Sequence, residues 1–196
     1  MSPSVIAQDW LSTQVGQWHC CPTCKEPLLL SQNQASCARC RAFYPVTFGI
    51  LDFRQAADTT AGFNAQRDLA IARTLEVESV GRSYFELYER YCAIVGTQRA
   101  PVGYAQQRRL QRADAHYRRL LRETHLQHGQ AILDKVSWYS AGMGRPWPIG
   151  GIALEDGAGL GQFVYGFAQR FDAVIVLDIS MSYLLLCRKL LNEHAL

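Results

Sequence analysis

The stretch ALEDGAGLGQF, residues 153–163, places three glycines at alternate positions directly behind two acidic residues. A short apolar run ends in this stretch, and the segment QFVYGFAQRF that follows has helical character. The next segment, AVIVLD, is rich in β-branched residues and ends on Asp178. The order strand, glycine loop, helix, strand, acid is typical of the first half of a Rossmann-type unit. The stretch therefore predicts an α/β fold in this part of the chain.

The spacing of the glycines bears on the ligand of this loop. A dinucleotide fingerprint, GxGxxG, requires glycine at position 162, where the chain has Gln162. The loop instead has the spacing GxGxG, formed by Gly157, Gly159 and Gly161. Glu155, two residues before the first glycine, suits a ligand with a positive ammonium group, and Asp178 can accept both hydroxyls of a ribose. S-adenosylmethionine carries both groups, and a nicotinamide or other nucleotide is the alternative.

Four of the seven cysteines form two CxxC pairs in the segment CPTCKEPLLLSQNQASCARC. These cysteines are Cys21, Cys24, Cys37 and Cys40, with twelve residues between the pairs. Each CxxC is a tight turn that directs two thiolates at one point, so two facing turns predict a tetrahedral zinc site. Four thiolates leave no position for water, which makes the predicted Zn2+ structural. A degenerate or redox role for these cysteines is the alternative.

Cys20 complicates the assignment, because it lies beside Cys21 and could compete with it for the metal. Proline follows Cys21 directly, and this CPxC register favours Cys21 as the ligand. In a cytosolic chain we expect the cysteines to stay reduced, and their odd number argues further against a disulfide framework.

Two groups of motifs resemble known families. The segments CPTCKEPL, CARC and FYPVTFGILDF together resemble the zinc ribbon of the small activator subunit of tRNA methyltransferases, which also occurs fused in front of many bacterial methyltransferase domains. The ribbon usually ends in GIPDF, and this chain has Leu51 in place of the proline. ALEDGAGLG with VIVLDIS resembles the first two motifs of class I S-adenosylmethionine-dependent methyltransferases. Asp156 departs from that pattern, where an apolar residue is usual.

The methyltransferase resemblance implies a role for each residue of the cofactor-binding loop. Gly157 and Gly159 would lie against the methionine part of S-adenosylmethionine, with Gly161 completing the loop. Glu155 would hold the ammonium group through water, and Asp178 would hold the ribose. No catalytic residue is predicted, because no base for the methyl acceptor can be named from these motifs.

The sequence predicts four regions. They are an N-terminal helix at 1–16, a zinc ribbon at 17–54, a helical region at 55–147 and a partial S-adenosylmethionine-binding Rossmann-like domain at 148–196. The family fold has more strands than the two predicted here, so we expect an incomplete sheet with exposed apolar surface. We therefore expect the chain to be the N-terminal part of a methyltransferase that is inactive by itself and binds the cofactor weakly.

The helical region carries two sets of boundary signals. The sequence SYFE, Ser83–Glu86, has capping-box spacing and predicts a helix that runs to about Val95 and ends at Gly96. Pro101 suits the first turn of a longer helix, and Gly129 suits its C-terminal stop.

This longer helix has a basic face between Arg108 and Arg122. The face comprises Arg108, Arg112, Arg118, Arg119 and Arg122. One interpretation is a solvated surface opposite an apolar stripe that faces the core. The other interpretation is a face that contacts the phosphates of RNA or an anionic substrate.

Composition limits the function further. The formal net charge of +3 is too small to indicate nucleic-acid binding by itself, and the chain has neither a secretory signal nor an apolar run of membrane-spanning length. We therefore expect a cytoplasmic protein without a membrane partner. The favoured function is a methyltransferase acting on a small molecule or metabolite. The alternatives are an RNA (rRNA or tRNA) methyltransferase and a non-catalytic zinc-binding interaction module.

Overall fold

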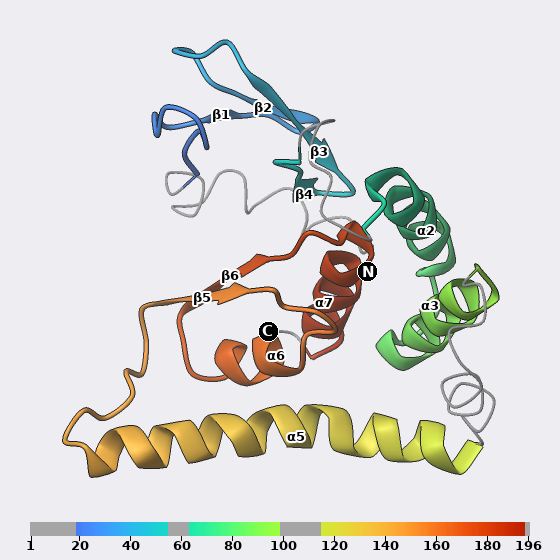
Figure 1. Ribbon diagram of the computed structural model, residues 1–196, viewed down its shortest axis with the longest axis vertical. Coiled ribbons are helices and arrows are strands. Elements are labelled where there is room, and N and C mark those ends of the chain that lie inside the picture. The colour runs from blue at the N-terminus through green and yellow to red at the C-terminus, as the bar shows by residue number, and fades with distance from the viewer. Residues whose placement is uncertain (1–18, 55–62, 99–114, 195–196) are drawn as a thin grey trace. The chain divides into compact units, whose positions relative to one another are not determined.

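The structure is a computed structural model that describes residues 19–54, 63–98 and 115–194 (Figure 1). The described residues form mixed α/β structure with five helices and two sheets, which confirms the predicted fold class at this level. The chain divides into two compact units, Met1–Phe63 and Asn64–Leu196. Among the described helices, none has both the length and the apolar character that crossing a membrane requires. The predicted N-terminal helix at 1–16 lies outside the described residues.

The first unit contains a four-stranded antiparallel sheet in the order β1-β2-β3-β4. Its strands are β1 (Leu29–Leu30), β2 (Gln34–Ser36), β3 (Phe43–Thr47) and β4 (Ile50–Leu51). The buried core of this unit is small and consists of Cys21, Leu28, Ala35, Cys37 and Tyr44. A core of this size needs a covalent or metal constraint to hold its fold.

The second unit contains all five described helices. They are α2 (Ala65–Glu78), α3 (Tyr84–Gln98), α5 (Ala115–Gly142), α6 (Gln162–Ala168) and α7 (Met181–Glu193). Helices α2 and α3 pack on each other and on α7 (Figure 1). Their shared core comprises Ile71, Leu75, Tyr84, Leu87, Leu186 and Leu190. Helices α2 and α3, from before the glycine loop, thus share one apolar core with α7, the last described helix.

The start of α3 has the capping box that the sequence predicts. The Ser83 amide donates to Oε2 of Glu86 at 2.7 Å, and the Glu86 amide donates to Oγ of Ser83 at 3.3 Å. The predicted end at Gly96 is wrong, because α3 continues to Gln98. A single glycine lowers helix propensity by about 1 kcal/mol, which is too little to end a helix by itself.

The glycine loop lies in a strand–helix–strand unit. Strands β5 (Ile152–Asp156) and β6 (Ala173–Leu177) pair in parallel and are connected through α6. In this register Ile152, Leu154 and Leu177 share one face of the sheet, and their exposed fractions are 48%, 60% and 41%. Parallel sheets are normally covered on both faces. Within the described residues, apolar side chains on this face of the sheet are exposed, as the sequence predicts.

The expectation that Gly129 ends the long helix is wrong, because α5 runs through this position to Gly142. Gly129 lies where α5 contacts α6, and a Cβ atom there would collide with the carbonyl oxygen of Gln162. Gly166 of α6 faces α5 in the same way, and a Cβ atom there would collide with Leu133. The two glycines therefore allow the close approach of the two helices.

This packing predicts the effect of two alanine substitutions in α5. Gly129→Ala should destabilise the second unit by about 1–3 kcal/mol, because its methyl group meets backbone atoms that cannot move aside. Gly142→Ala is the matched control, since a Cβ there meets nothing within 4 Å, and it should leave stability unchanged or slightly increased. Urea unfolding of the two variants measures the difference. Equal stability of the two variants would contradict the close helix contact.

Candidate functional site

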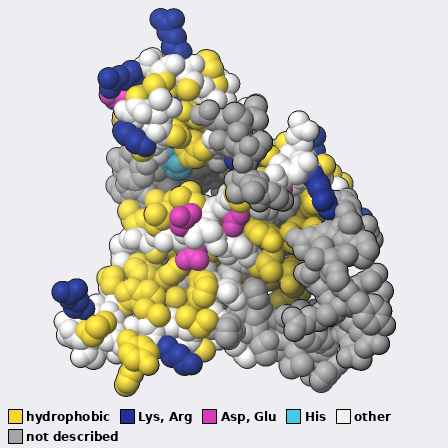
Figure 2. Space-filling model, in the orientation of Figure 1, with side chains coloured by type: hydrophobic (Ala, Val, Ile, Leu, Met, Phe, Trp, Pro, Cys, Tyr) yellow, Lys and Arg dark blue, Asp and Glu magenta, His cyan; other side chains and the backbone are white. Residues whose placement is uncertain are grey.

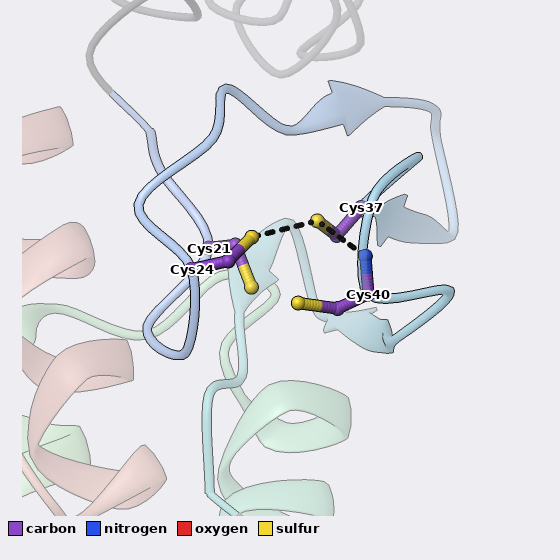
Figure 3. Close-up of side chains that lie close together, drawn as sticks. All are labelled: Cys21, Cys24, Cys37 and Cys40. Atoms are coloured by element: carbon purple, nitrogen blue, oxygen red, sulfur yellow. Dashed lines mark hydrogen bonds between the residues drawn. The ribbon is translucent and has the colours of Figure 1, made fainter.

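Two turns of the first unit bring four cysteine side chains together. Cys21 and Cys24 precede β1, and Cys37 and Cys40 lie between β2 and β3. The four Sγ atoms lie within 4.8 Å of one another, with the side chains of each pair directed at those of the other pair (Figure 3). The Sγ atoms of Cys24 and Cys37 are 3.4 Å apart. The cluster is compatible with a structural metal such as zinc.

The two turns have the same backbone geometry. The Cys21 carbonyl accepts a hydrogen bond from the Lys25 amide at 2.9 Å, and the Cys37 carbonyl accepts one from the Arg41 amide at 2.8 Å. Lys25 and Arg41 follow the second cysteine of each pair, and both have positive φ, at 65° and 56°. This matched conformation directs both thiols of each pair to the same side of the turn.

The pKa values of the Cys21 and Cys40 thiols are shifted in opposite directions. A hydrogen bond from the Tyr44 hydroxyl, at 3.3 Å, lowers the pKa of Cys21 to about 6. In contrast, the contact with the Cys24 thiol raises the pKa of Cys40 to about 12. Four thiolates at such distances repel one another, and a divalent cation between them removes that repulsion. The chemistry of this donor set therefore suits a soft divalent metal ion.

Cys20 lies outside the cluster. It is exposed, and its backbone forms an isolated bridge with Pro27. The structure thus brings together the four cysteines of the CPxC register and excludes the neighbouring thiol from the group.

Metal content should distinguish the two adjacent cysteines. Cys21→Ser should abolish or strongly reduce metal binding and unfold the first unit, because metal binding and folding are coupled in so small a core. Cys20→Ser is the control and should keep one metal ion per chain. Metal analysis by mass spectrometry, with chelator titration followed by circular dichroism, measures both effects. Retention of metal by Cys21→Ser, or its loss from Cys20→Ser alone, would contradict the site.

The glycine loop, residues 157–161, connects β5 to α6. Gly157, Gly159 and Gly161 have φ values of 77°, 53° and 84°, in the left-handed region that favours glycine. A Cβ atom would meet nothing within 4 Å at Gly157, and only a carbonyl oxygen at 4.0 Å at Gly159. At Gly161 a Cβ atom would lie 3.0 Å from Sγ of Cys187. Gly157 and Gly159 therefore border open space, whereas Gly161 packs on α7.

Asp178 lies beside this loop, directly after β6. Its Oδ2 accepts a hydrogen bond from the Gly159 amide at 2.8 Å, and its Oδ1 accepts one from the Ser180 amide at 2.8 Å. The parallel register brings the carboxyl ends of β5 and β6 together, which explains this contact across nineteen positions. Each carboxylate oxygen has a second lone pair, so Asp178 retains capacity to accept further hydrogen bonds.

Glu155 and Asp156 add two more carboxylates at the end of β5. Burial, followed by the neighbouring charge of Asp156, raises the pKa of Glu155. Among the described residues its carboxylate has no hydrogen-bond partner. Burial, and then the charges of Asp178 and Glu155, raise the pKa of the Cys187 thiol to about 12. Figure 2 shows acidic side chains gathered near the carboxyl ends of β5 and β6, beside hydrophobic surface.

The raised pKa of Glu155 predicts a pH-dependent effect on stability. An acid whose pKa is higher in the folded state costs no stability below its unfolded pKa, and its cost is complete above its folded pKa. Glu155→Gln should therefore raise the melting temperature at neutral pH, and the gain should disappear as the solution becomes acidic. Asp156→Asn is the control, because Asp156 is the neighbouring residue and is exposed. Thermal unfolding between pH 4 and 8 tests this, and a gain that is independent of pH would contradict it.

Two residues that sequence reasoning missed also contact this region. The Tyr84 hydroxyl donates to the Leu160 carbonyl at 2.5 Å. Asp68 of α2 accepts hydrogen bonds from Oγ of Ser180 and the amide of Met181, both at 2.7 Å. The partners are separated by 76 to 113 positions in the chain, so no local motif indicates these contacts.

The predicted basic face cannot be placed against this site. Arg108 and Arg112 lie outside the described residues, and the side chains of Arg118, Arg119 and Arg122 are also outside the described part of α5. The two interpretations of this face therefore remain predictions.

Comparisons with protein-family models, with curated protein sequences and with solved structures found no match to this chain. The geometry of the cysteine cluster and of the glycine loop therefore indicates what each site can bind.

Proposed function

We propose that the strand–helix–strand segment binds S-adenosylmethionine and is the cofactor-binding part of a methyltransferase. The observation that carries this proposal is the closure of the glycine loop on Asp178, through the 2.8 Å hydrogen bond from the Gly159 amide. Gly157 and Gly159 border open space. The contact keeps these two glycines next to the carboxylates at the ends of β5 and β6. Ligands of open α/β sheets bind at this end of the strands.

The charge of the site supports a cationic ligand. Glu155, Asp156 and Asp178 lie at or directly after the ends of the two strands. A pyrophosphate would be repelled by these carboxylates, whereas the ammonium and sulfonium groups of S-adenosylmethionine would be attracted. The missing glycine at Gln162 points in the same direction, because the dinucleotide fingerprint requires it.

Each residue has a defined task in this proposal. Glu155 supplies a partly buried carboxylate for the ammonium group, with no hydrogen-bond partner among the described residues. Asp178 keeps its hydrogen bond to Gly159 and accepts ribose hydroxyls through its remaining lone pairs. Gly157 and Gly159 let the ligand approach the backbone, since a side chain at either position would occupy that space. When bound, S-adenosylmethionine would supply the methyl group, and we propose a small molecule or metabolite as its acceptor.

The first unit serves as a structural zinc ribbon in this proposal. Two of its five core residues, Cys21 and Cys37, are also members of the metal cluster. The ion would thus stabilise the fold directly, and four sulfur ligands would leave it no open position for catalysis.

A non-catalytic interaction module is a second candidate, and the surface of the ribbon favours it. Leu29 and Phe43 both pair with Ser36, so the three residues form one row across the sheet. Leu29 and Phe43 are each 66% exposed, so two large apolar side chains of this row are available to a partner. This candidate requires the metal but no cofactor, and it predicts that S-adenosylmethionine does not bind.

Ligand titration separates the two candidates. In two-dimensional 1H–15N NMR spectra, S-adenosylmethionine should shift the amide signals of Gly157 and Gly159, while NAD should shift them little. This measurement detects the weak binding expected of the chain. Shifts that are equal for both ligands, or that are absent with S-adenosylmethionine, would remove the methyltransferase proposal.

Glu155→Gln tests the charge argument without breaking a hydrogen bond within the described structure. The affinity for S-adenosylmethionine should fall at least about tenfold, because a hydrogen bond to a charged group is worth roughly 1.5–3 kcal/mol. Asp156→Asn is the matched control and should reduce affinity less, since Asp156 is exposed. An equal loss in both variants would mean that general charge, rather than the position of Glu155, governs binding.

A further inference from the structure

The glycine loop is held by contacts that come from outside it. The Leu177 carbonyl accepts hydrogen bonds from the amides of Gly157 and Ala158, at 2.9 and 3.1 Å. The Asp178 carboxylate accepts a hydrogen bond from the Gly159 amide at 2.8 Å. These contacts all come from the end of β6, within the strand–helix–strand unit. They act on the first half of the loop.

The second half of the loop is held from a different element. The Tyr84 hydroxyl, at the start of α3, donates to the carbonyl of Leu160 at 2.5 Å. Leu160 stands between Gly159 and Gly161, two residues in the left-handed conformation. Glycines have the largest backbone freedom, so a fixed carbonyl between them restricts the loop strongly.

Tyr84 is itself firmly placed. Its side chain is fully buried in the core between α2, α3 and α7. Its amide donates to Oε1 of Glu193, near the end of α7, at 2.6 Å. Burial raises the pKa of Tyr84, so the hydroxyl keeps its proton and remains a donor. A donor held at both its backbone and its ring acts as a fixed point for the loop.

We propose that Tyr84 is a positioning residue for ligand binding at the glycine loop. Helix α3, which lies outside the strand–helix–strand unit, sets the loop conformation through the Leu160 carbonyl. The inference rests on the proposed function of this loop as a ligand site. It extends that site to Tyr84 of α3, which lies 76 positions before Leu160 in the chain.

Tyr84→Phe removes the hydroxyl and keeps the buried ring. Tyr91→Phe is the matched control, because Tyr91 is also on α3 and its ring contacts Tyr183 of α7 rather than the loop. Hydrogen exchange, followed by mass spectrometry, should show about three- to tenfold faster exchange in peptides covering residues 157–165 for Tyr84→Phe. Tyr91→Phe should leave these peptides unchanged. Unchanged loop exchange in Tyr84→Phe, or the same increase in both variants, would overturn the proposal.

Ligand affinity gives the second readout. In an NMR titration with S-adenosylmethionine, Tyr84→Phe should bind about three- to tenfold more weakly than Tyr91→Phe and the unmodified chain. Equal affinities would overturn the positioning role. If the unmodified chain does not bind S-adenosylmethionine, the proposed function fails, while loop exchange still decides whether Tyr84 holds the loop.

A measurement on the unmodified chain covers the case in which Tyr84→Phe does not fold. The Tyr84 hydroxyl proton should exchange slowly enough for NMR detection and show a nuclear Overhauser contact to the Gly161 amide, whose residue follows Leu160. A rapidly exchanging hydroxyl without that contact would overturn the proposal.

Discussion

The hydrogen bond between the Gly159 amide and the Asp178 carboxylate is the contact on which the proposed site depends. It closes the glycine loop against the end of β6 and leaves open space beside Gly157 and Gly159. The other oxygen of the same carboxylate accepts a hydrogen bond from the amide of Ser180, the residue directly before α7. One side chain therefore sets both the shape of the loop and the start of the following helix. A ligand at this end of the sheet would meet a loop that is already ordered, which reduces the entropy cost of binding.

A second carboxylate, that of Asp68, connects α2 to the start of α7. Asp68 is 7% exposed, and a buried charge is costly unless it is paired or hydrogen-bonded. Here it accepts from the Ser180 hydroxyl and the Met181 amide, at the amino end of α7, where the helix dipole favours negative charge. The ion pair between Arg188 and Glu76 adds a further link between α7 and α2. Because Asp68 of α2 accepts a hydrogen bond from the first amide of α7, we infer that the two helices fold as parts of one cooperative unit.

The sequence predicts those features whose signals are local. The cysteine spacing, the Ser83–Glu86 capping box and the glycine loop behind its apolar run each lie within one short segment of the chain. Their geometry follows from turn and helix chemistry. The roles of Asp68 and Tyr84 depend on partners far along the chain, so no spacing rule could identify them. Gly129 illustrates a different limit. A glycine suits a helix end and a close helix contact equally well, and only the position of α6 distinguishes the two.

The two units obtain their stability from different sources. The second unit buries a cluster of aliphatic and aromatic side chains from three helices, and this cluster needs no metal. Among its described residues the first unit buries five, two of which are cysteines of the cluster, so loss of a metal would remove a cross-link within this core. Metal binding would therefore govern the order of the first unit, while the glycine loop keeps its conformation through Asp178 and Tyr84. On this argument, loss of metal and loss of ligand binding are separable events, because the contacts that hold each site lie within its own unit.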